Sequence, residues 1–121
     1  MEKKILIVED QADLRDMLAM LLRVEGFVTV TASDGREGLE AMKKDCPHLI
    51  ITDINMPNMN GIDMVRMIRE MPHCDSIPIL VVTAVGSGIA SDAIAAGANQ
   101  ALIKPVELEA LVNGVKRLLE P

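Results

Sequence analysis

The sequence predicts an α/β fold in which helices cover both faces of a parallel β-sheet. Short, wholly apolar runs, as expected of strands buried on both faces, alternate with stretches in which apolar residues recur at helical spacing. Five such strand–helix units follow one another, which favours a parallel sheet flanked by helices on both sides. The 121 residues suit one compact domain, and half of them are hydrophobic.

The expected strands are short and rich in Ile, Leu and Val. Since the chain has one Phe and neither Trp nor Tyr, its core must be aliphatic. In chain order, the expected strands cover residues 5–8, 27–31, 49–51, 79–82 and 101–103.

The expected helices follow from apolar residues spaced three and four apart. Four of them are regular, and the fourth in chain order is weak because glycines surround its start, where each Gly costs about 1 kcal/mol relative to Ala. We therefore expect that helix to be short or mobile. In chain order, the expected helices cover residues 14–22, 34–42, 61–68, 87–96 and 108–119.

Helix boundaries have signals of their own. Asp13 is the expected cap at the start of the first helix, and Gly26 is its expected end. Asp34 and Glu37 have the spacing of a capping box, which predicts the start of the second helix. Gly61 is expected to open the third.

Composition excludes several classes of protein. The net charge is −6, and Lys and Arg form no basic stripe, so no direct nucleic-acid binding is expected. No apolar run is long enough for a secretory signal or a membrane span. Cys46 and Cys74 do not resemble a disulfide framework, so we expect reduced thiols and a cytoplasmic location.

Polar groups that could carry chemistry follow four of the five expected strands. Glu9 and Asp10 follow the first, Asp53 the third, Thr83 ends the fourth, and Lys104 follows the fifth. With a strand order of 2-1-3-4-5, the carboxylates converge at the switch point where parallel sheets bind ligands. Clustered carboxylates need a cation, and Mg²⁺ prefers oxygen ligands. Each group alone is commonplace, but together they suit phosphoryl transfer.

The sequence resembles the receiver domains of bacterial two-component signalling over essentially its whole length. This resemblance implies one domain over residues 1–121, with a doubly wound, flavodoxin-like fold of five strands in the order 2-1-3-4-5 and five helices. The segments that carry it are residues 5–10, 53–61, 82–84, 96–98 and 104–105.

The resemblance also assigns a phosphoacceptor and a metal site. Asp53 matches the carboxylate that attacks phosphorus and becomes an acyl phosphate. Glu9 and Asp10 match the acid pair that holds Mg²⁺ together with Asp53, and the main-chain carbonyl of Asn55 matches a further ligand.

Three more positions match groups that handle the phosphoryl oxygens. Thr83 matches the hydroxyl that moves toward the phosphoryl group, and the Ala84 amide and Lys104 match groups that hold its oxygens. The family's Lys–Pro bond is commonly cis, which predicts a cis Lys104–Pro105 peptide.

The implied function is a switch rather than a turnover enzyme. The phosphoryl donor would be a histidine kinase or a histidine phosphotransfer protein, and the phosphorylated form would control an effector protein or an output domain. Because the sequence ends directly after the last expected helix, we expect no output domain within these 121 residues.

The sequence departs from the family at Ala101 and at Val106, which replaces a Phe often found after the Lys–Pro pair. Ala101 replaces the aromatic residue whose ring usually reports phosphorylation, so either backbone shifts carry the signal or this surface is not the output. Small residues there could provide a face for a homodimer, and relaxed constraint is the rival explanation. At the two positions that shape phosphoryl lifetime stand Asn55 and Val85, which predict slow to moderate self-dephosphorylation.

Two other classes of function compete with the switch. One is an interaction or dimerisation module that uses the fold without phosphorylation. The other is a phosphatase of the haloacid-dehalogenase type, which places a second Asp two residues after the nucleophile as general acid. Asn55 occupies that position here, which argues against the phosphatase.

Overall fold

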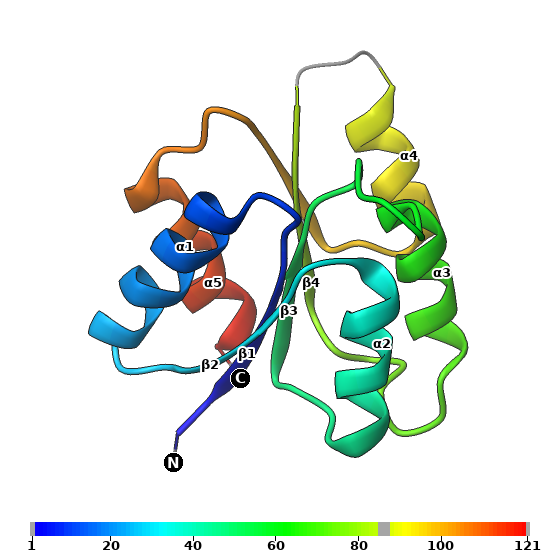
Figure 1. Cartoon of the computed structure of the whole chain (residues 1–121), viewed down its shortest axis with the longest axis horizontal. Coiled ribbons are helices and arrows are strands. Elements are labelled where there is room, and N and C mark those ends of the chain that lie inside the picture. The colour runs from blue at the N-terminus through cyan, green and yellow to red at the C-terminus, as the bar shows by residue number, and fades with distance from the viewer. Residues whose placement is uncertain (1, 85–87, 121) are drawn as a thin grey trace.

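The computed structural model describes residues 2–84 and 88–120 and shows a parallel sheet between two layers of helices (Figure 1). Every neighbouring pair of strands is parallel, and the order in the sheet is β2-β1-β3-β4-β5. The predicted strand order and doubly wound fold are therefore confirmed. The strands are β1 (Lys4–Val8), β2 (Val28–Ala32), β3 (Leu49–Thr52), β4 (Ile79–Thr83) and β5 (Gln100–Ile103).

The helices form the two outer layers. Within the described residues they are α1 (Ala12–Val24), α2 (Gly35–Lys44), α3 (Gly61–Glu70), α4 (Ile89–Ala96) and α5 (Leu108–Leu119). Helices α1 and α5 cover one face of the sheet, and α2, α3 and α4 cover the other (Figure 1). Nowhere in the described part of the chain is a helix both long enough and apolar enough to cross a membrane.

The strands divide the core into two halves. Along β1, Ile5 and Ile7 belong to the cluster packed under α1 and α5, whereas Leu6 and Val8 belong to the cluster under the other three helices. Strands β3 and β4 are buried at every position, while the edge strands β2 and β5 are partly exposed. This is why the central strands are apolar up to their last residues, Thr52 and Thr83.

The start of α1 differs from the prediction. Its N-cap is Gln11, which makes no capping hydrogen bond through its side chain, and Asp13 lies inside the first turn. The predicted Asp13 cap is therefore wrong. An acid in the first turn still stabilises the positive end of the helix dipole.

The end of α1 is the predicted Gly26. Its φ of 98° lies in the left-handed region that glycine adopts without strain. Its N–H donates to the Arg23 carbonyl, and the Phe27 N–H donates to the Leu22 carbonyl, each over 3.0 Å. These two bonds form a Schellman motif. Because Phe27 is used in it, β2 begins one residue later than predicted.

The start of α2 confirms the predicted capping signal. Asp34 is the N-cap, and its Oδ1 accepts a hydrogen bond from the Glu37 N–H over 2.8 Å. The Glu37 carboxylate reaches back to the Ser33 N–H over 3.0 Å. Asp34 Oδ2 also accepts from Asn58 Nδ2 over 2.7 Å, which ties the loop after β3 to the start of α2. The Glu37 amide, followed by Asn58, holds the pKa of Asp34 below its usual value.

Asp34→Ala should lower the free energy of unfolding by about 1 kcal/mol, as is typical for loss of an N-cap. Urea denaturation monitored by circular dichroism would measure it. Asp63→Ala is the matched control, because Asp63 is a first-turn acid of α3 that pairs, among the described residues, only with the exposed Arg66. The control should cost less than about 0.5 kcal/mol. Equal losses in the two variants would contradict the capping role.

Helix α4 is short, as predicted. It covers eight residues from Ile89 to Ala96 and follows Gly88, whose φ is 85°. The predicted start at Ser87 lies outside the described residues.

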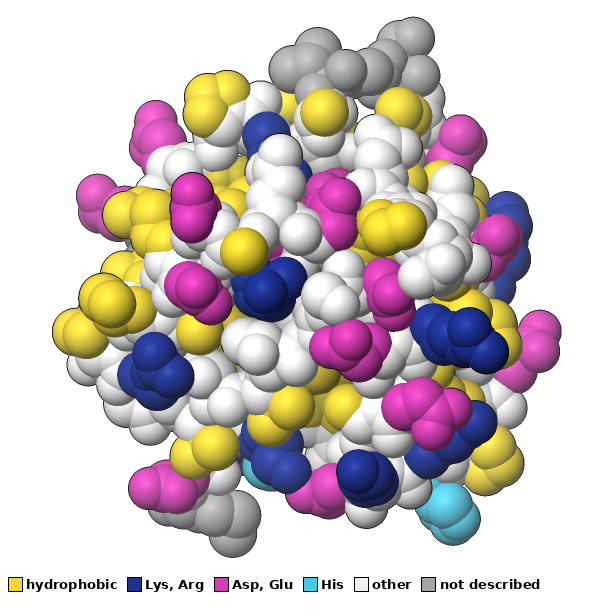
Figure 2. Space-filling view, viewed as in Figure 1, with side chains coloured by type: hydrophobic (Ala, Val, Ile, Leu, Met, Phe, Trp, Pro, Cys, Tyr) yellow, Lys and Arg dark blue, Asp and Glu magenta, His cyan; other side chains and the backbone are white. Residues whose placement is uncertain are grey.

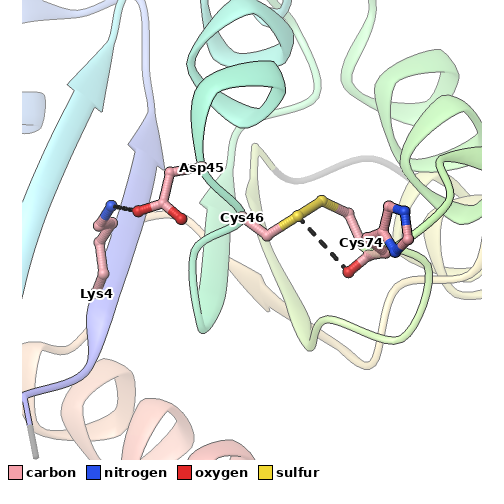
Figure 3. Close-up of a disulfide and its surroundings, with 5 residues drawn as sticks. Lys4, Asp45, Cys46 and Cys74 are labelled. Carbon is pink, nitrogen blue, oxygen red and sulfur yellow. Dashed lines mark hydrogen bonds and ion pairs between the residues drawn. A yellow bond between two sulfur atoms is a disulfide. The ribbon is translucent and has the colours of Figure 1, made fainter.

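The cysteines overturn a prediction. Cys46 and Cys74 form a disulfide with a Cα–Cα distance of 5.9 Å, so they are not the reduced, unpaired thiols that the sequence suggested (Figure 3). Cys46 precedes β3 and Cys74 precedes β4. Because these strands are neighbours in the sheet, the loops that lead into them meet, although the cysteines are 28 residues apart in sequence.

Candidate functional site

Three carboxylates converge where β1 and β3 end. Glu9 and Asp10 follow β1, Asp53 follows β3, and one oxygen from each lies within 4.8 Å of the others. Glu9 and Asp53 are buried, with 2% and 6% of their surface exposed, whereas Asp10 is exposed. The pairing of Val8 with Thr52 across the two strands brings these acids together.

Lys104 supplies positive charge to this cluster from the end of β5. Its Nζ lies 3.0 Å from Asp53 Oδ2 and 3.2 Å from Glu9 Oε1. Burial by itself lowers the pKa of Lys104, but its bonds and charge attraction to Asp53 and Glu9 outweigh burial and raise that pKa. The lysine is therefore charged, and it offsets part of the cost of two buried carboxylates.

Glu9 is the most strongly buried acid of the cluster. Its burial raises the pKa of its carboxyl above the usual value, and the neighbouring Asp10 and Asp53 raise it further. The Gln11 N–H donates to Glu9 Oε2 over 3.1 Å and opposes that rise. The Arg15 guanidinium donates to the main-chain oxygen of Glu9 over 3.0 Å. The turn after β1 thus holds Glu9 at both its side chain and its backbone.

Asp53 is held in one orientation by its own loop. The Ile54 N–H donates to Asp53 Oδ1 over 2.6 Å, and the Asp53 N–H donates to the Val8 carbonyl over 3.1 Å. The Gly61 N–H closes the loop by donating to the Ile54 carbonyl over 2.8 Å. The second carboxylate oxygen of Asp53 faces Lys104 and the other acids.

The remaining predicted site residues lie around this cluster. Thr83 is fully buried at the end of β4, and its Oγ1 has no hydrogen-bond partner among residues 2–84 and 88–120. Such a buried hydroxyl costs about 1–3 kcal/mol while it lacks a partner, which suits a group that binds a ligand. Ala84 and Asn55 are exposed. The predicted cis peptide between Lys104 and Pro105 is confirmed.

The donor set fits a divalent cation with hard ligands. Glu9, Asp10 and Asp53 offer carboxylate oxygens only, and no sulfur or imidazole belongs to the group. Mg²⁺ prefers such oxygen ligands and is usually bound by one or two carboxylates while it keeps several waters. The exposure of Asp10 leaves room for that water.

The departures from the family pattern lie away from the carboxylates. Ala101 is half-buried and packs against the core cluster under α2, α3 and α4. Ile94 and Ile103 on α4 and β5 are exposed to 45% and 43%. The homodimer stays a prediction. Val85, one of the two positions predicted to shape phosphoryl lifetime, lies outside the described residues.

Comparison with known proteins assigns the family. The family model described as the response regulator receiver domain matches residues 5–116. The chain belongs to this family. The fold and the family inferred from the sequence are both confirmed.

Solved structures and curated relatives agree with the assignment. This receiver domain superposes on the chemotaxis response regulator CheY4 of Vibrio cholerae with a TM-score of 0.91, at 32% identity, over 98% of this chain and all of that one. It is 32% identical to a 14.6 kDa protein of Leptolyngbya boryana over 93% of this chain and 87% of that protein. It is 36% identical to the DNA-binding response regulator MtrA of Mycobacterium tuberculosis over 98% of this chain. The receiver domain spans about half of MtrA, 51% of its length.

Some groups of the site were not predicted from the sequence. The contact of Arg15 could have been predicted, because a basic residue in the first turn of α1 lies close to the acids that precede the helix. The hydrogen bonds of the Gln11 and Ile54 amides could not have been predicted. Every residue but proline has an N–H, and only the folded turn decides where it points. Asn58 has a φ of 70°, and an Asn within a turn is a weak hint of such a conformation.

Proposed function

We propose that residues 1–121 act as one receiver domain whose Asp53 accepts a phosphoryl group in a Mg²⁺-dependent reaction. The observation that carries this proposal is the environment of Asp53. Its carboxylate is buried, lies 3.0 Å from Lys104 Nζ, and shares an oxygen cluster with Glu9 and Asp10. A nucleophilic carboxylate beside a cation and a hard-metal site suits phosphoryl transfer, which depends on positioning and charge compensation.

The transfer exchanges one bond to phosphorus for another. A carboxylate oxygen of Asp53 forms a P–O bond as the P–N bond of a phosphohistidine breaks, and the electron pair of that bond leaves with the imidazole. Lys104 lies where it can bind a phosphoryl oxygen, and the Ala84 amide would hold another. Thr83 Oγ1, which lacks a partner among the described residues, would donate to the phosphoryl group.

Mg²⁺ fits this site through Glu9, Asp10 and Asp53, with the main-chain carbonyl of Asn55 as a fourth protein ligand. When bound, the ion neutralises charge on the carboxylates and the phosphoryl oxygens. Lys104 would supply further positive charge, since its Nζ contacts Asp53 Oδ2 and Glu9 Oε1 directly.

The phosphoryl group stays on Asp53 and changes the state of the domain, so no product is released. The acyl phosphate on Asp53 places new charge beside Thr83 and Lys104, and their response would reach an effector or an output domain. A histidine kinase or a histidine phosphotransfer protein would be the donor. Because such kinases draw their phosphoryl group from ATP, we propose a cytoplasmic location.

Incubation with Mg²⁺ and acetyl phosphate should add one phosphoryl group to the wild-type protein and none to Asp53→Asn. Intact mass is the appropriate measurement, because the chain has no Trp for a fluorescence assay. The added mass should depend on Mg²⁺ and disappear with hydroxylamine, which cleaves acyl phosphates. The Asn side chain has nearly the same shape as Asp, so the variant is expected to fold.

Absence of any added mass in a folded protein that binds Mg²⁺ would contradict the switch. It would favour the phosphorylation-independent interaction module. An equal gain in Asp53→Asn would move the acceptor to another residue.

A groove beside the site suits a donor protein. It has a volume of about 490 Å³ and runs between the start of α1 and the segment after β5. Lys104 and Ala84 line it together with the apolar side chains of Leu14, Met17 and Leu108. Met17 and Leu108 are exposed to 43% and 42%. Hydrophobic side chains gather on the side of the molecule over α1 (Figure 2). A helix bearing phosphohistidine could bind there and present its ring to Asp53.

Met17→Asp should slow transfer from a phosphorylated histidine phosphotransfer protein at least about tenfold, the loss expected from about 1.4 kcal/mol of binding energy. Transfer from acetyl phosphate should stay unchanged, because that donor is too small to use the groove. Met20→Asp is the matched control, since Met20 is more exposed, at 62%, and does not line the groove. Equal slowing by both variants, or slowing with acetyl phosphate, would contradict this docking surface.

A further inference from the structure

The cysteine pair lies far from the acid cluster, at the end of the sheet where strands begin. Cys46 belongs to the loop between α2 and β3, and Cys74 belongs to the loop between α3 and β4 (Figure 3). The proposed phosphorylation of Asp53 uses neither residue. The pair therefore needs an explanation of its own.

The two cysteines differ in their exposure to solvent. Cys74 is buried, with 2% of its surface exposed, whereas Cys46 is only half-buried. Thiol–disulfide exchange requires a thiolate to approach a sulfur atom in line with the bond that breaks. An external thiol can therefore attack at Cys46, and Cys74 is the sulfur that leaves.

Cys46 also has a hydrogen-bond partner for its reduced form. Its Sγ lies 3.6 Å from the main-chain oxygen of His73, which can accept a hydrogen bond from a thiol. The main-chain oxygen of His73 is therefore within reach of the Cys46 thiol once the two sulfur atoms move apart on reduction.

The loop that carries Cys74 is connected to the α4–β5 turn through one side chain. Arg69, in the last turn of α3, donates from Nη1 to the main-chain oxygens of Asp75 and Ile77 over 2.9 and 2.7 Å. The same guanidinium donates from Nη2 to Gly97 O over 2.7 Å and to Asn99 Oδ1 over 2.9 Å. A change in how firmly residues 74–77 are held therefore acts on the α4–β5 turn.

We propose that Cys46 and Cys74 form a reversible redox modification site that exchanges with low-molecular-weight thiols and disulfides of the glutathione class through Cys46. The state of this pair sets how firmly the α3–β4 loop and, through Arg69, the α4–β5 turn are held. Disulfides that exchange in this way are typical of redox sensing in reducing compartments.

The exchange balances as two successive transfers. In the first, the Cys46 thiolate attacks oxidised glutathione, which forms a mixed disulfide on Cys46 and releases one glutathione thiol. In the second, the Cys74 thiolate attacks the Cys46 sulfur, which closes the protein disulfide and releases a second glutathione. Two electrons pass from the two cysteines to the external disulfide, and the reverse sequence reduces the protein.

The site is tested by exposing the protein to oxidised glutathione, quenching with an alkylating reagent and measuring intact mass. Wild-type protein, once reduced, should return to the disulfide form without retaining glutathione. Cys74→Ser should accumulate one glutathione on Cys46, and Cys46→Ser should react at least tenfold more slowly because its remaining thiol is buried. Equal reactivity of the two single variants, or failure of the reduced wild type to reform the disulfide, would overturn the proposal.

Hydrogen–deuterium exchange on the wild-type protein tests the connection through Arg69 without any substitution. Reduction should accelerate exchange at least threefold in residues 71–78 and in residues 97–100 at labelling times too short for exchange through global unfolding, when β1 and β3 are still protected. Faster exchange in the Cys74 loop alone would overturn the role of Arg69, and uniform acceleration across the sheet would indicate general destabilisation instead.

Discussion

Gly61→Ala is expected to lower the free energy of unfolding by about 3 kcal/mol and to remove most phosphoacceptance at Asp53, because overpacking against rigid backbone forces atoms to shift. A Cβ at this position would overlap the Asp53 carbonyl oxygen and lie 2.7 Å from Ile54 Cα. Both are backbone atoms of the strand–loop junction, so no side chain can turn away to make room. The shift falls on the residue that carries the acceptor carboxylate.

Urea denaturation measures the free energy of unfolding. Intact mass after treatment with Mg²⁺ and acetyl phosphate measures how much of the protein accepts a phosphoryl group. Gly114→Ala is the matched control. Its Cβ would approach only the end of the Gln100 side chain, at 3.2 Å, which is flexible. Because Ala is favoured over Gly in a helix by about 1 kcal/mol, the control should be neutral or stabilising. If Gly61→Ala were as stable as the wild type, the loop after β3 would be able to move aside for the added Cβ, which would contradict the prediction.

Reduction of the Cys46–Cys74 disulfide is expected to lower the free energy of unfolding by about 3.5 kcal/mol. The chain-entropy relation gives this value for a bond that closes a loop over 28 residues, because the open chain gains freedom when unfolded. For a chain of 121 residues, such a loss corresponds to a fall in melting temperature of about 14 °C.

Thermal unfolding monitored by circular dichroism, with and without a phosphine reductant, measures this fall. The double variant Cys46→Ser/Cys74→Ser is the control. Its melting temperature should lie near that of the reduced wild type and should not change when the reductant is added. A reductant effect in the double variant would place the sensitivity outside this disulfide. A fall of less than about 3 °C in the wild type would mean that the two loops are held mainly by other contacts, with Arg69 the first to examine.

The order of elements followed directly from the sequence. Strands β1, β3 and β4 are buried on both faces, so nearly all of their residues are apolar, and an apolar run of three or four residues is conspicuous in a sequence. The helices bury one side only, which gives the spacing of three and four. Both patterns are local consequences of burial, and local patterns can be read without knowing the neighbours in space.

Boundaries were predictable where the signal was a backbone constraint. Gly26 ends α1 because its left-handed conformation favours glycine, and Asp34 caps α2 through its own side chain. Asp13 failed as a cap because the chain turns into the helix two residues earlier, at Gln11. Caps with no side-chain bond leave no mark in the sequence.

The candidate site was predictable in its members but not in its contacts. Glu9, Asp10, Asp53 and Lys104 follow strands, and parallel strands bring their carboxyl ends to one edge, so convergence follows from topology. The bonds of Lys104 to both Glu9 and Asp53, and the support of Glu9 by Arg15, depend on side-chain positions that only packing defines.

The alternation of strands and helices, the apolar core and the polar groups at the strand ends could all be predicted from the order of residues. Three features became visible only in the folded chain. Cys46 meets Cys74, Arg69 joins the α3–β4 loop to the α4–β5 turn, and the buried Thr83 hydroxyl has no partner among the described residues. The two groups of features differ in range. Burial leaves a periodic pattern in the local sequence and capping joins residues close in sequence, whereas these contacts join residues that only the packed sheet brings together.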